Sequence, residues 1–343
     1  MNTMKAVGVT HYLPIDQADS LLDVEIPRPS ASGHDLLVQV QAISVNPVDT
    51  KIRAPKDQVE ENPRILGWDV AGIVVEVGNQ VTHFQVGDEV FYAGSVTRAG
   101  GNSEYHLVDE RIVGHKPKSL DFAAAAALPL TALTAWEAIH ERLGISEDAV
   151  SNAGHTILII NAAGGVGSIA TQMAHLAGLT VIGTASRPET SDWAKAHGAD
   201  HVINHHDAFV PQLKKIGFSD VNYILCLNHT NQHWQHMADA IAPQGKICSI
   251  VETEQPIDLE ALKNKSATFV WEFMFTRSMY ETDDMSEQGV ILNRIASQID
   301  EGKLRTTETK RLHPINATQL REAHRLLEAG DMIGKLVLED FES

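Results

Sequence analysis

Residues 156–167, with the sequence TILIINAAGGVG, constrain the fold of this chain more than any other segment. The apolar run at residues 157–160 has the length and branching of a buried parallel strand. It ends on a glycine-rich turn, and residues 168–177 then show the apolar spacing of a helix packed on a sheet. This order of strand, turn and helix predicts a βαβ unit of a doubly wound parallel sheet.

The turn itself is a close variant of the pattern G-x-G-x-x-G, with Ala162 at the first glycine position. It needs glycine because its backbone bends sharply and approaches a pyrophosphate, while the following helix presents free N–H groups. We therefore expect a bound dinucleotide, with a tight strand-to-helix connection as the alternative. The expected cofactor-binding residues of this loop are Ala163, Gly164, Gly165, Val166 and Gly167.

The end of the next predicted strand, residues 180–185, distinguishes between two cofactors. An NAD site places an acidic residue about 20 residues beyond the glycines, whereas an NADP site needs cations and small donors for the extra phosphate. Here Ser186 and Arg187 follow the strand, and no acid occurs until Glu189. The sequence thus predicts NADPH, although Arg187 could also be a solvated residue before Pro188 at the start of a helix.

Composition excludes several classes of protein. The chain has 343 residues, 43% of them hydrophobic, so it can bury a core in each of two domains. Its formal net charge of −18 disfavours nucleic acids and anionic membranes as partners. Cys226 and Cys248 lie in apolar contexts, so we expect buried thiols and a cytoplasmic protein. No secretory signal is apparent, and the most apolar segment, residues 122–136, is interrupted by Pro129 and too short to span a bilayer.

The pattern of predicted secondary structure divides the chain into two parts. Its first part alternates short β-like runs with Gly and Pro turns, which predicts a β-rich domain with a barrel-like core. From about residue 130, strands and helices alternate as in a parallel doubly wound sheet. A final strand at residues 334–338 is expected to return to the first domain. The predicted strands of the first part are residues 4–9, 36–44, 70–77, 88–92 and 103–108.

Seven short stretches of the chain together carry a resemblance to a known family: SVNPVD (44–49), GWDVAG (67–72), GDEV (87–90), ALPLT (127–131), AAGGVG (162–167), HGADHVI (197–203) and GKLVL (334–338). Over essentially its full length the chain resembles the medium-chain dehydrogenases/reductases, and most of all their quinone-oxidoreductase-like branch, which includes proteins called zinc-type alcohol dehydrogenase-like. The resemblance implies an α/β fold in which a GroES-like, β-rich catalytic domain is interrupted by a Rossmann domain with a doubly wound parallel sheet. We expect the catalytic domain at residues 1–128 and 276–343, and the NADP-binding domain at 129–275.

The resemblance also bears on metal binding. In zinc alcohol dehydrogenases a cysteine stands at the position of Asn46, and a His-Glu pair stands at the position of Trp68 and Asp69. An amide and an indole are not ligands that a catalytic zinc ion uses, and two cysteines cannot form the four-cysteine structural site. We therefore expect no metal. Other histidines, including His205, His206, His229, His233 and His236, lack the spacing of the family's zinc site.

Three residues are candidates for catalysis. The amide of Asn46 could donate to the substrate oxygen or hold the nicotinamide ribose, or it could fix the turn before Pro47. Lys51 lies where several quinone reductases of the family carry a tyrosine, so it is either a proton donor or a solvated lysine. Tyr92 could line the pocket of a planar acceptor or belong to the core.

Three further residues are expected at the cofactor from the resemblance. Thr131 matches a residue that approaches the nicotinamide, and its alternative role is to cap a helix. His205 matches a position that contacts the adenosine phosphate in relatives that use NADPH, and its alternative is a plain loop histidine. Lys335 lies in the matched GKLVL stretch.

Taken together, the residues predict an NADPH-dependent oxidoreductase that transfers hydride to a quinone or an α,β-unsaturated carbonyl without zinc. A conjugated acceptor is favoured because it spreads the developing charge without a Lewis acid. The alternatives are a non-catalytic NADPH-binding protein and a zinc-dependent alcohol dehydrogenase. In relatives, the strand that matches the aromatic segment at residues 269–280 pairs with its copy, so a homodimer is also expected.

Overall fold

The computed structural model describes residues 3–342, which divide into two compact units. The first unit comprises Met1–Leu130 and Phe275–Ser343, and the second comprises Thr131–Met274. The chain therefore leaves the first unit once and returns to it, with the crossings at residues 130/131 and 274/275. The expected crossings lie at residues 128/129 and 275/276.

The second unit is built on one parallel sheet. Within the described residues this sheet has six strands in the order β11-β10-β9-β12-β13-β14, which is the order 3-2-1-4-5-6 of a Rossmann domain. All neighbouring strands pair in parallel, as the alternation of strands and helices predicts. The strands are β9 (Thr156–Ile160), β10 (Thr180–Thr184), β11 (His201–Ile203), β12 (Val221–Cys226), β13 (Ile241–Ser249) and β14 (Thr268–Trp271).

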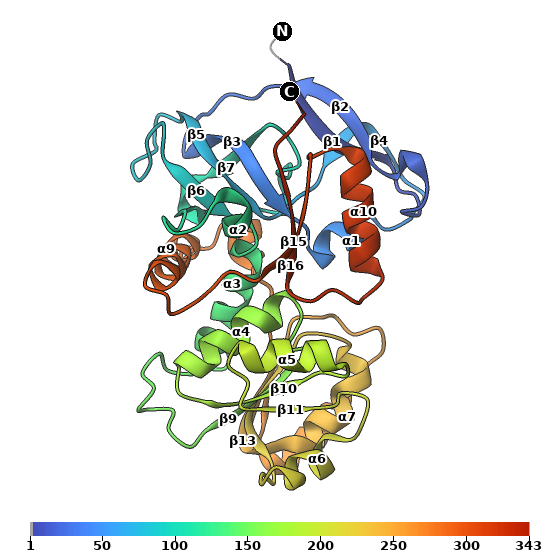
Figure 1. The fold of residues 1–343 in the computed structure, drawn as a ribbon, viewed down its shortest axis with the longest axis vertical. Coiled ribbons are helices and arrows are strands. Elements are labelled where there is room, and N and C mark those ends of the chain that lie inside the picture. Colours follow the sequence, from blue (N-terminus) through green and yellow to red (C-terminus); the bar gives the residue numbers. More distant parts are fainter. Residues whose placement is uncertain (1–2, 343) are drawn as a thin grey trace. The chain divides into compact units, whose positions relative to one another are not determined.

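A row of apolar side chains crosses this sheet and explains why its strands are continuous hydrophobic runs. Ile182, Leu158, Ile224 and Ile247 are paired in register from β10 to β13, and all four are fully buried. Figure 1 shows α4 and α5 packed against β9 and β10. The helices of this unit are α4 (Gly165–Leu176), α5 (Pro188–Ala196), α6 (Phe209–Lys215), α7 (Thr230–Ala240) and the 3₁₀ segment η4 (Leu259–Lys265).

The first unit is β-rich, and its described residues form two sheets. The smaller has the order β2-β1-β4, and the larger has the order β15-β16-β3-β5-β6-β8 with β7 added on β3. The C-terminal strand β16 pairs antiparallel with β3, with Leu338 opposite Ile43, so the returning C-terminal part of the chain joins the larger sheet formed by the first part. The strands are β1 (Thr3–His11), β2 (Leu22–Pro27), β3 (Asp35–Ser44), β4 (Val59–Ile65), β5 (Val70–Val77), β6 (Glu89–Tyr92), β7 (Tyr105–Asp109), β8 (Gly114–His115), β15 (Glu308–Leu312) and β16 (Lys335–Glu339).

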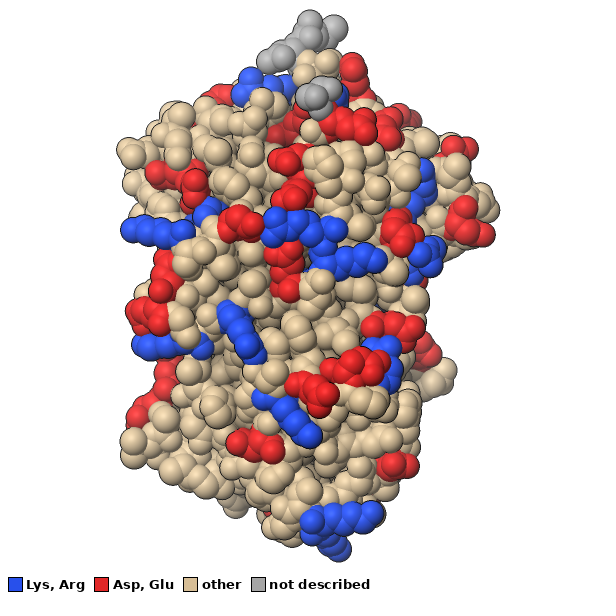
Figure 2. All heavy atoms as spheres, viewed as in Figure 1, with Lys and Arg blue, Asp and Glu red and all other residues tan. Residues whose placement is uncertain are grey.

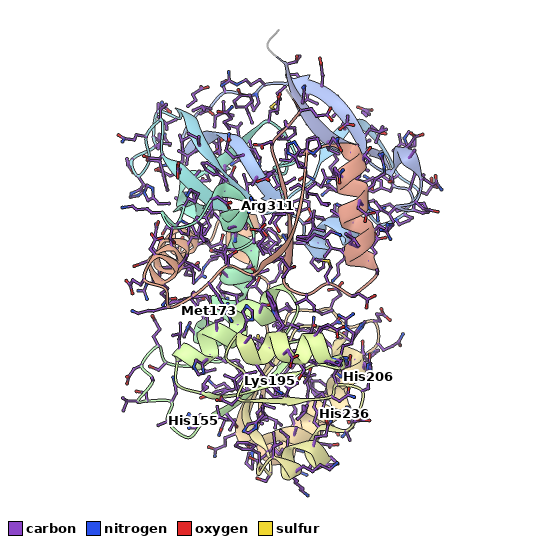
Figure 3. All side chains as sticks on the ribbon, in the orientation of Figure 1. His155, Met173, Lys195, His206, His236 and Arg311 are labelled. Atoms are coloured by element: carbon purple, nitrogen blue, oxygen red, sulfur yellow. The ribbon has the colours of Figure 1, made fainter. Side chains whose placement is uncertain are left out.

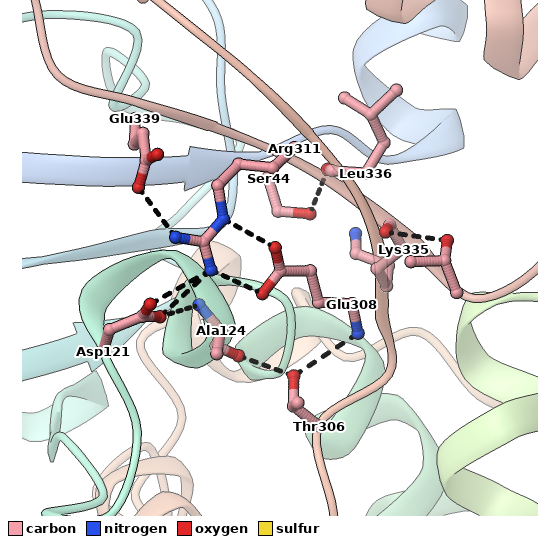
Figure 4. Close-up of polar contacts among 10 residues, drawn as sticks. Ser44, Asp121, Ala124, Thr306, Glu308, Arg311, Lys335, Leu336 and Glu339 are labelled. Atoms are coloured by element: carbon pink, nitrogen blue, oxygen red, sulfur yellow. Dashed lines mark hydrogen bonds and ion pairs between the residues drawn. The ribbon is translucent and has the colours of Figure 1, made fainter.

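Helices of the first unit pack against its strands and against one another. The C-terminal part of the chain forms α8 (Thr276–Tyr280), α9 (Glu287–Asp300) and α10 (Ala317–Glu328), where α10 lies against α1 (Pro47–Arg53). Arg311 on β15 bonds the carboxylates of Glu308, Glu339 and Asp121, which ties β15 and β16 to the start of α2 (Phe122–Ala126) (Figure 4). The remaining helical turns are η1 (Ala18–Ser20) and η2 (Glu110–Ile112).

The apolar segment that follows Asp121 is longer than expected. Helical residues extend over Phe122–Arg142, through α2, α3 (Pro129–Trp136) and a π-helical stretch, η3 (Glu137–Arg142). These 21 residues are long and apolar enough to cross a membrane, so the expectation of a segment too short to do so was wrong. Pro129 is the first residue of α3, where its missing N–H costs no helical hydrogen bond. Because 94% of the apolar window is buried inside the protein, the segment has the character of a core helix.

The aromatic segment at residues 269–280 does not form one strand. Only Thr268–Trp271 belongs to the sheet, and the chain then passes to the first unit and forms α8. Both cysteines are free and buried, as expected. On the face shown in Figure 2, acidic and basic side chains are interspersed with uncharged surface rather than segregated.

Candidate functional site

The glycine-rich turn of the second unit connects β9 to α4 by the route that the motif predicts. Gly164 is extended, with φ −72° and ψ 177°, and α4 starts at Gly165. Asn161 has a positive φ of 68°, and its N–H donates to the hydroxyl of Thr184 at 3.0 Å. A Cβ atom at Gly167 would lie 2.1 Å from the carbonyl oxygen of Asn161, so only glycine lets the first turn of α4 pack this closely on the loop. This tight start of a helix can receive a pyrophosphate on its free N–H groups.

Ala162 stands where the motif has its first glycine, and its methyl group faces Gly183 of β10. A Cβ atom at Gly183 would lie 2.9 Å from the Cβ of Ala162. The neighbouring strand thus supplies the space that alanine takes, which explains how the loop tolerates the departure from the motif. Ala163 is buried, whereas Gly164, Gly165 and Val166 are partly exposed.

The ends of β10 and β11 bring the predicted adenosine-phosphate residues to one edge of the sheet. The two strands pair at Thr184 and Ile203, and the N–H of Ala185 donates to the carbonyl of Ile203 at 3.0 Å. Ser186 and Arg187 therefore follow one strand, and His205 follows its neighbour. Ser186 is exposed, and Arg187 and His205 are partly exposed.

Arg187 has a fixed backbone and a side chain at the surface. The backbone N–H of Arg187 donates to the hydroxyl of Thr190. The O–H of Thr190 in turn donates to the backbone carbonyl of Arg187 at 2.9 Å. The guanidinium group pairs with the carboxylate of Glu189 at 3.3 Å, and both side chains are more than one-third exposed. An ion pair of this exposure is weak, so a phosphate can displace Glu189 from Arg187.

Five histidines gather beside α7 at the same end of the sheet: His205, His206, His229, His233 and His236, of which His206 and His236 are labelled in Figure 3. Burial, with the nearby histidines, lowers the pKa of His233 to about 4, so its imidazole is neutral at pH 7. Within residues 3–342, no group of three or more His, Cys, Asp or Glu side chains could hold a metal ion.

In the first unit, Lys335 is the centre of a buried polar cluster. Its ammonium group donates to the carbonyl of Val45 at 2.8 Å, to Oδ1 of Asn46 at 2.5 Å and to Oδ2 of Asp69 at 3.1 Å. Asn46 precedes α1, Asp69 precedes β5 and Lys335 begins β16, so three separate elements meet here. All three side chains are at most 4% exposed. An ammonium group has three donors, and the cluster occupies all of them.

Several other polar groups of the cluster are also paired. The amide of Asn46 donates to Oδ2 of Asp69 at 2.8 Å and to the carbonyl of Trp68 at 3.3 Å. Oδ1 of Asp69 accepts from the N–H of Leu130 at 2.7 Å, and Asp49 accepts from the N–H of Asn46 at 2.7 Å. Asp69 and Lys335 thus form a buried ion pair, with 3.1 Å between Nζ of Lys335 and Oδ2 of Asp69.

Burial dominates the protonation of these groups. It raises the pKa of Asp49 to about 7, against the opposing effects of the Asn46 N–H and Lys335. Burial also raises the pKa of Asp69, where Lys335 and Asn46 act in the opposite direction, and it lowers the pKa of Lys335. The cluster therefore contains one basic group and two carboxyl groups. Burial disfavours the charged form of both carboxyl groups, so it opposes their simultaneous ionisation.

The predicted catalytic residues occupy different environments. Both N–H groups of the Asn46 amide are engaged inside the protein, so donation to a substrate stays a prediction that requires one of these bonds to be exchanged. Lys51 is exposed on α1. Tyr92 is fully buried, and its hydroxyl lies 3.0 Å from Nδ1 of His106. Because Nε2 of His106 lies 2.8 Å from the carbonyl of Ala99, the hydroxyl of Tyr92 is the donor in this pair.

The expected cofactor residues Thr131 and Lys335 are both buried. Thr131 is 2% exposed near the start of α3 and belongs to the second unit. Lys335 has no donor left for a cofactor phosphate while the cluster is intact. Neither GWDVAG nor GKLVL predicts that Asp69 is the partner of Lys335, although each contains a charged residue within an apolar run.

A second buried acidic site, in the other unit, escaped the sequence analysis. Glu272 follows β14 and Glu137 begins the π-helical stretch, and neither is more than 2% exposed. Arg142 donates from Nε to Oε2 of Glu272 at 2.8 Å. Burial, the charge of Glu137 and a hydrogen bond to Glu137 raise the pKa of Glu272 to about 8, although Arg142 acts in the opposite direction.

Comparison with known proteins agrees with this architecture. Residues 32–118 match the alcohol dehydrogenase GroES-like domain, and residues 197–338 match the family described as zinc-binding dehydrogenase. The zinc-type alcohol dehydrogenase-like protein of Staphylococcus epidermidis is 44% identical over 336 residues, which cover 98% of this chain and 99% of that protein. The chain is a medium-chain dehydrogenase/reductase.

Solved structures of this superfamily point to its quinone-oxidoreductase-like branch. A Rhizobium etli protein described as a candidate zinc-dependent alcohol dehydrogenase is 50% identical, with a TM-score of 0.95 and complete coverage of both chains. The quinone oxidoreductase of Coxiella burnetii is 27% identical, with a TM-score of 0.81 over 99% of this chain and 100% of that one. This medium-chain dehydrogenase/reductase thus combines a GroES-like domain with a Rossmann domain.

Zinc, which several of these family names mention, does not fit the matched positions of this member. The indole N–H of Trp68 donates to the carbonyl of Ser95 at 3.0 Å, so this ring is a donor in a buried bond. The oxygens of Asn46 and Asp69 face the ammonium group of Lys335 instead of an open position. A catalytic zinc site needs three ligands, usually from Cys, His and carboxylates, and an open position.

Proposed function

We propose that this protein is an NADPH-dependent oxidoreductase that reduces a quinone or an α,β-unsaturated carbonyl without zinc. NADPH supplies the hydride from C4 of its nicotinamide. The observation that carries the proposal is the buried ammonium of Lys335, which faces the positions where zinc-dependent relatives have their metal ligands. A conjugated acceptor fits this arrangement because it spreads the developing charge without a Lewis acid.

The residues that follow the C-terminal ends of β10 and β11 support the preference for NADPH. Arg187 and His205 follow neighbouring strands, and no carboxylate precedes Glu189 where an NAD site would have one. Arg187 provides a planar set of donors for a phosphate, and Ser186 provides an exposed hydroxyl. The close packing at Gly167 fixes the start of α4, whose free N–H groups would hold the pyrophosphate of a bound cofactor.

The residues of the chain act in this proposal by binding and orientation. Gly164, Gly165 and the first N–H groups of α4 hold the pyrophosphate, and Arg187 holds the adenosine phosphate. Lys335, Asn46 and Asp69 keep the N-terminus of α1 in place, and Lys51 on that helix remains the candidate proton donor to the reduced acceptor. The name of the Coxiella burnetii relative, a quinone oxidoreductase, supports this class of acceptor.

Steady-state assays test the proposal. Purified protein is assayed with NADPH and with NADH against a panel of quinones, enones and simple ketones, and its metal content is measured in parallel. We expect turnover of conjugated acceptors with NADPH, little turnover of simple ketones, and no effect of a chelator. Tight NADPH binding without any turnover would favour a non-catalytic binding protein. Stoichiometric zinc with chelator-sensitive alcohol oxidation would favour an alcohol dehydrogenase.

We also propose a homodimer that uses the free edge of β14. This strand is the last of its sheet, and Trp271 is 46% exposed beside Phe269, with ring centroids 4.9 Å apart. An exposed apolar edge strand is prone to pair with another strand. Light scattering of the wild type and of Trp271→Glu tests this, because a dimer that uses this edge dissociates in the variant.

A further inference from the structure

The cluster around Lys335 is built like a binding site for a cation. Its three acceptors are a main-chain carbonyl, an amide oxygen and a carboxylate, which come from two loops and lie 2.8, 2.5 and 3.1 Å from the ammonium nitrogen. These acceptors are fixed by bonds of their own: Asn46 donates to Asp69, and Leu130 donates to Asp69. The arrangement is thus an oxygen cage, held in place by the elements around it.

The chemistry of the cage selects its occupant. All three ligands are oxygens, and no sulfur or ring nitrogen belongs to the set. Oxygen ligands suit ammonium groups and hard cations, whereas Zn²⁺ sites in proteins use Cys and His together with carboxylates. The three acceptors also match the three N–H donors of a primary ammonium ion.

The charges of the cluster require a cation. Asp49 and Asp69 are fully buried, and Lys335 is the basic partner in the ion pair with Asp69. Removing one member of a buried ion pair leaves the other charge uncompensated. This destabilises the folded protein far more than replacing both members by uncharged residues. If the side chain of Lys335 is removed, the oxygens of Val45, Asn46 and Asp69 surround the space that its ammonium group occupied.

We propose that this cage is a cation-binding site for primary ammonium ions, whose permanent occupant is the side chain of Lys335. The site binds a free alkylammonium ion when the lysine side chain is removed. This inference concerns the cluster alone and does not depend on the proposed reaction.

The variant Lys335→Ala tests the proposal because it removes three carbons and the ammonium group, which n-propylammonium replaces atom for atom. Thermal unfolding is followed with increasing n-propylammonium chloride at constant ionic strength. We expect the variant to melt well below the wild type and to recover part of this loss in a saturable manner. Ligand at ten times its Kd lowers the unfolding equilibrium constant about tenfold.

Matched controls separate binding in the cage from general effects of salt. Lys335→Met fills the side-chain volume without a charge, so n-propylammonium should not rescue it. Tetramethylammonium carries a charge but no N–H donors, so it should not rescue Lys335→Ala. Lys310→Ala, at an exposed position on β15, should respond to neither ion. Equal recovery with both ions, or recovery of Lys335→Met, would overturn the proposal, as would a folded Lys335→Ala that n-propylammonium does not stabilise.

A second experiment covers the case in which Lys335→Ala does not fold. The variants Lys335→Met and Asp69→Asn are compared with the double variant by chemical unfolding. The cage predicts that the double variant increases the unfolding equilibrium constant at least tenfold less than the two single effects multiplied together, because removing both members of the Asp69–Lys335 ion pair leaves neither without its partner. Additive effects would contradict an ion-filled cage. Both experiments read stability, so a wild type without reductase activity would reject the proposed function and leave this inference standing.

Discussion

Replacing Glu272 by glutamine should make the protein more stable above neutral pH, which is unusual for the loss of a carboxyl group that bonds an arginine. The carboxyl group is fully buried beside Glu137 and bonded to Arg142. Its pKa is raised from 4.5 to about 8, first by burial and then by Glu137. The folded protein therefore keeps a proton on Glu272 at a pH at which the unfolded chain has lost it.

The sign and size of the effect follow from linkage. Between pH 4.5 and about pH 8 the folded state binds more protons than the unfolded state, so the free energy of unfolding falls as the pH rises. The contribution is fully present below pH 4.5 and is lost as the pH rises through about 8. At about 1.4 kcal/mol for each tenfold change in proton binding, the loss amounts to at most ~5 kcal/mol.

Chemical unfolding of the wild type and of Glu272→Gln, at about pH 5 and about pH 9, measures this effect. The variant should gain stability over the wild type by several kcal/mol between the two pH values, because its amide never ionises. Glu141→Gln is the control, since Glu141 is exposed and lies 3.9 Å from the same Arg142. A stability difference between wild type and Glu272→Gln that stays the same at both pH values would refute the reasoning.

Three further predictions concern the cofactor loop, the phosphate site and a surface ion-pair network. Gly167→Ala should cost about 2 kcal/mol or more and weaken NADPH binding, because the new Cβ would lie 2.1 Å from a carbonyl oxygen; chemical unfolding and fluorescence titration measure both. Arg187→Ala should raise the KM for NADPH about tenfold and leave the KM for NADH nearly unchanged. Lys195→Ala, at an exposed position on α5, is the control, and equal effects on both cofactors would reject the phosphate role of Arg187. Arg311→Ala should cost only about 1 kcal/mol, because the side chain is 35% exposed, and the loss should shrink at about 1 M NaCl; a loss that is independent of salt would contradict this.

The Rossmann unit was largely predictable because its signals are local. Buried parallel strands are continuous apolar runs, so β9, β10 and β12 are visible in the sequence, and the glycine pattern marks the turn after β9. The edge strands were harder to find. The strand β4 contains Pro63 and three charged residues, and β2 alternates in exposure at the edge of its sheet, so neither has a strong apolar pattern.

The candidate site was predictable only in part. The residues near the cofactor loop follow from short motifs, whereas the polar cluster joins residues that are 266 to 290 positions apart. The structure changes the roles expected for Asn46 and Lys335, because their N–H donors bond to groups inside the protein. The amide of Asn46 donates to Trp68 and Asp69, and the ammonium group of Lys335 donates to Val45. The buried pair of Glu137 and Glu272 gave no signal, since a charged residue in a sequence is by default a surface residue.

The sequence by itself determined the superfamily, the parallel sheet and the place of the glycine-rich turn, because strand branching, helical spacing and glycine act over a few neighbouring residues. The tertiary structure alone decided which charged side chains are buried and what neutralises them. Burial and pairing depend on groups that folding brings together from distant parts of the chain, and no local pattern records that Lys335 fills the cage formed by Val45, Asn46 and Asp69.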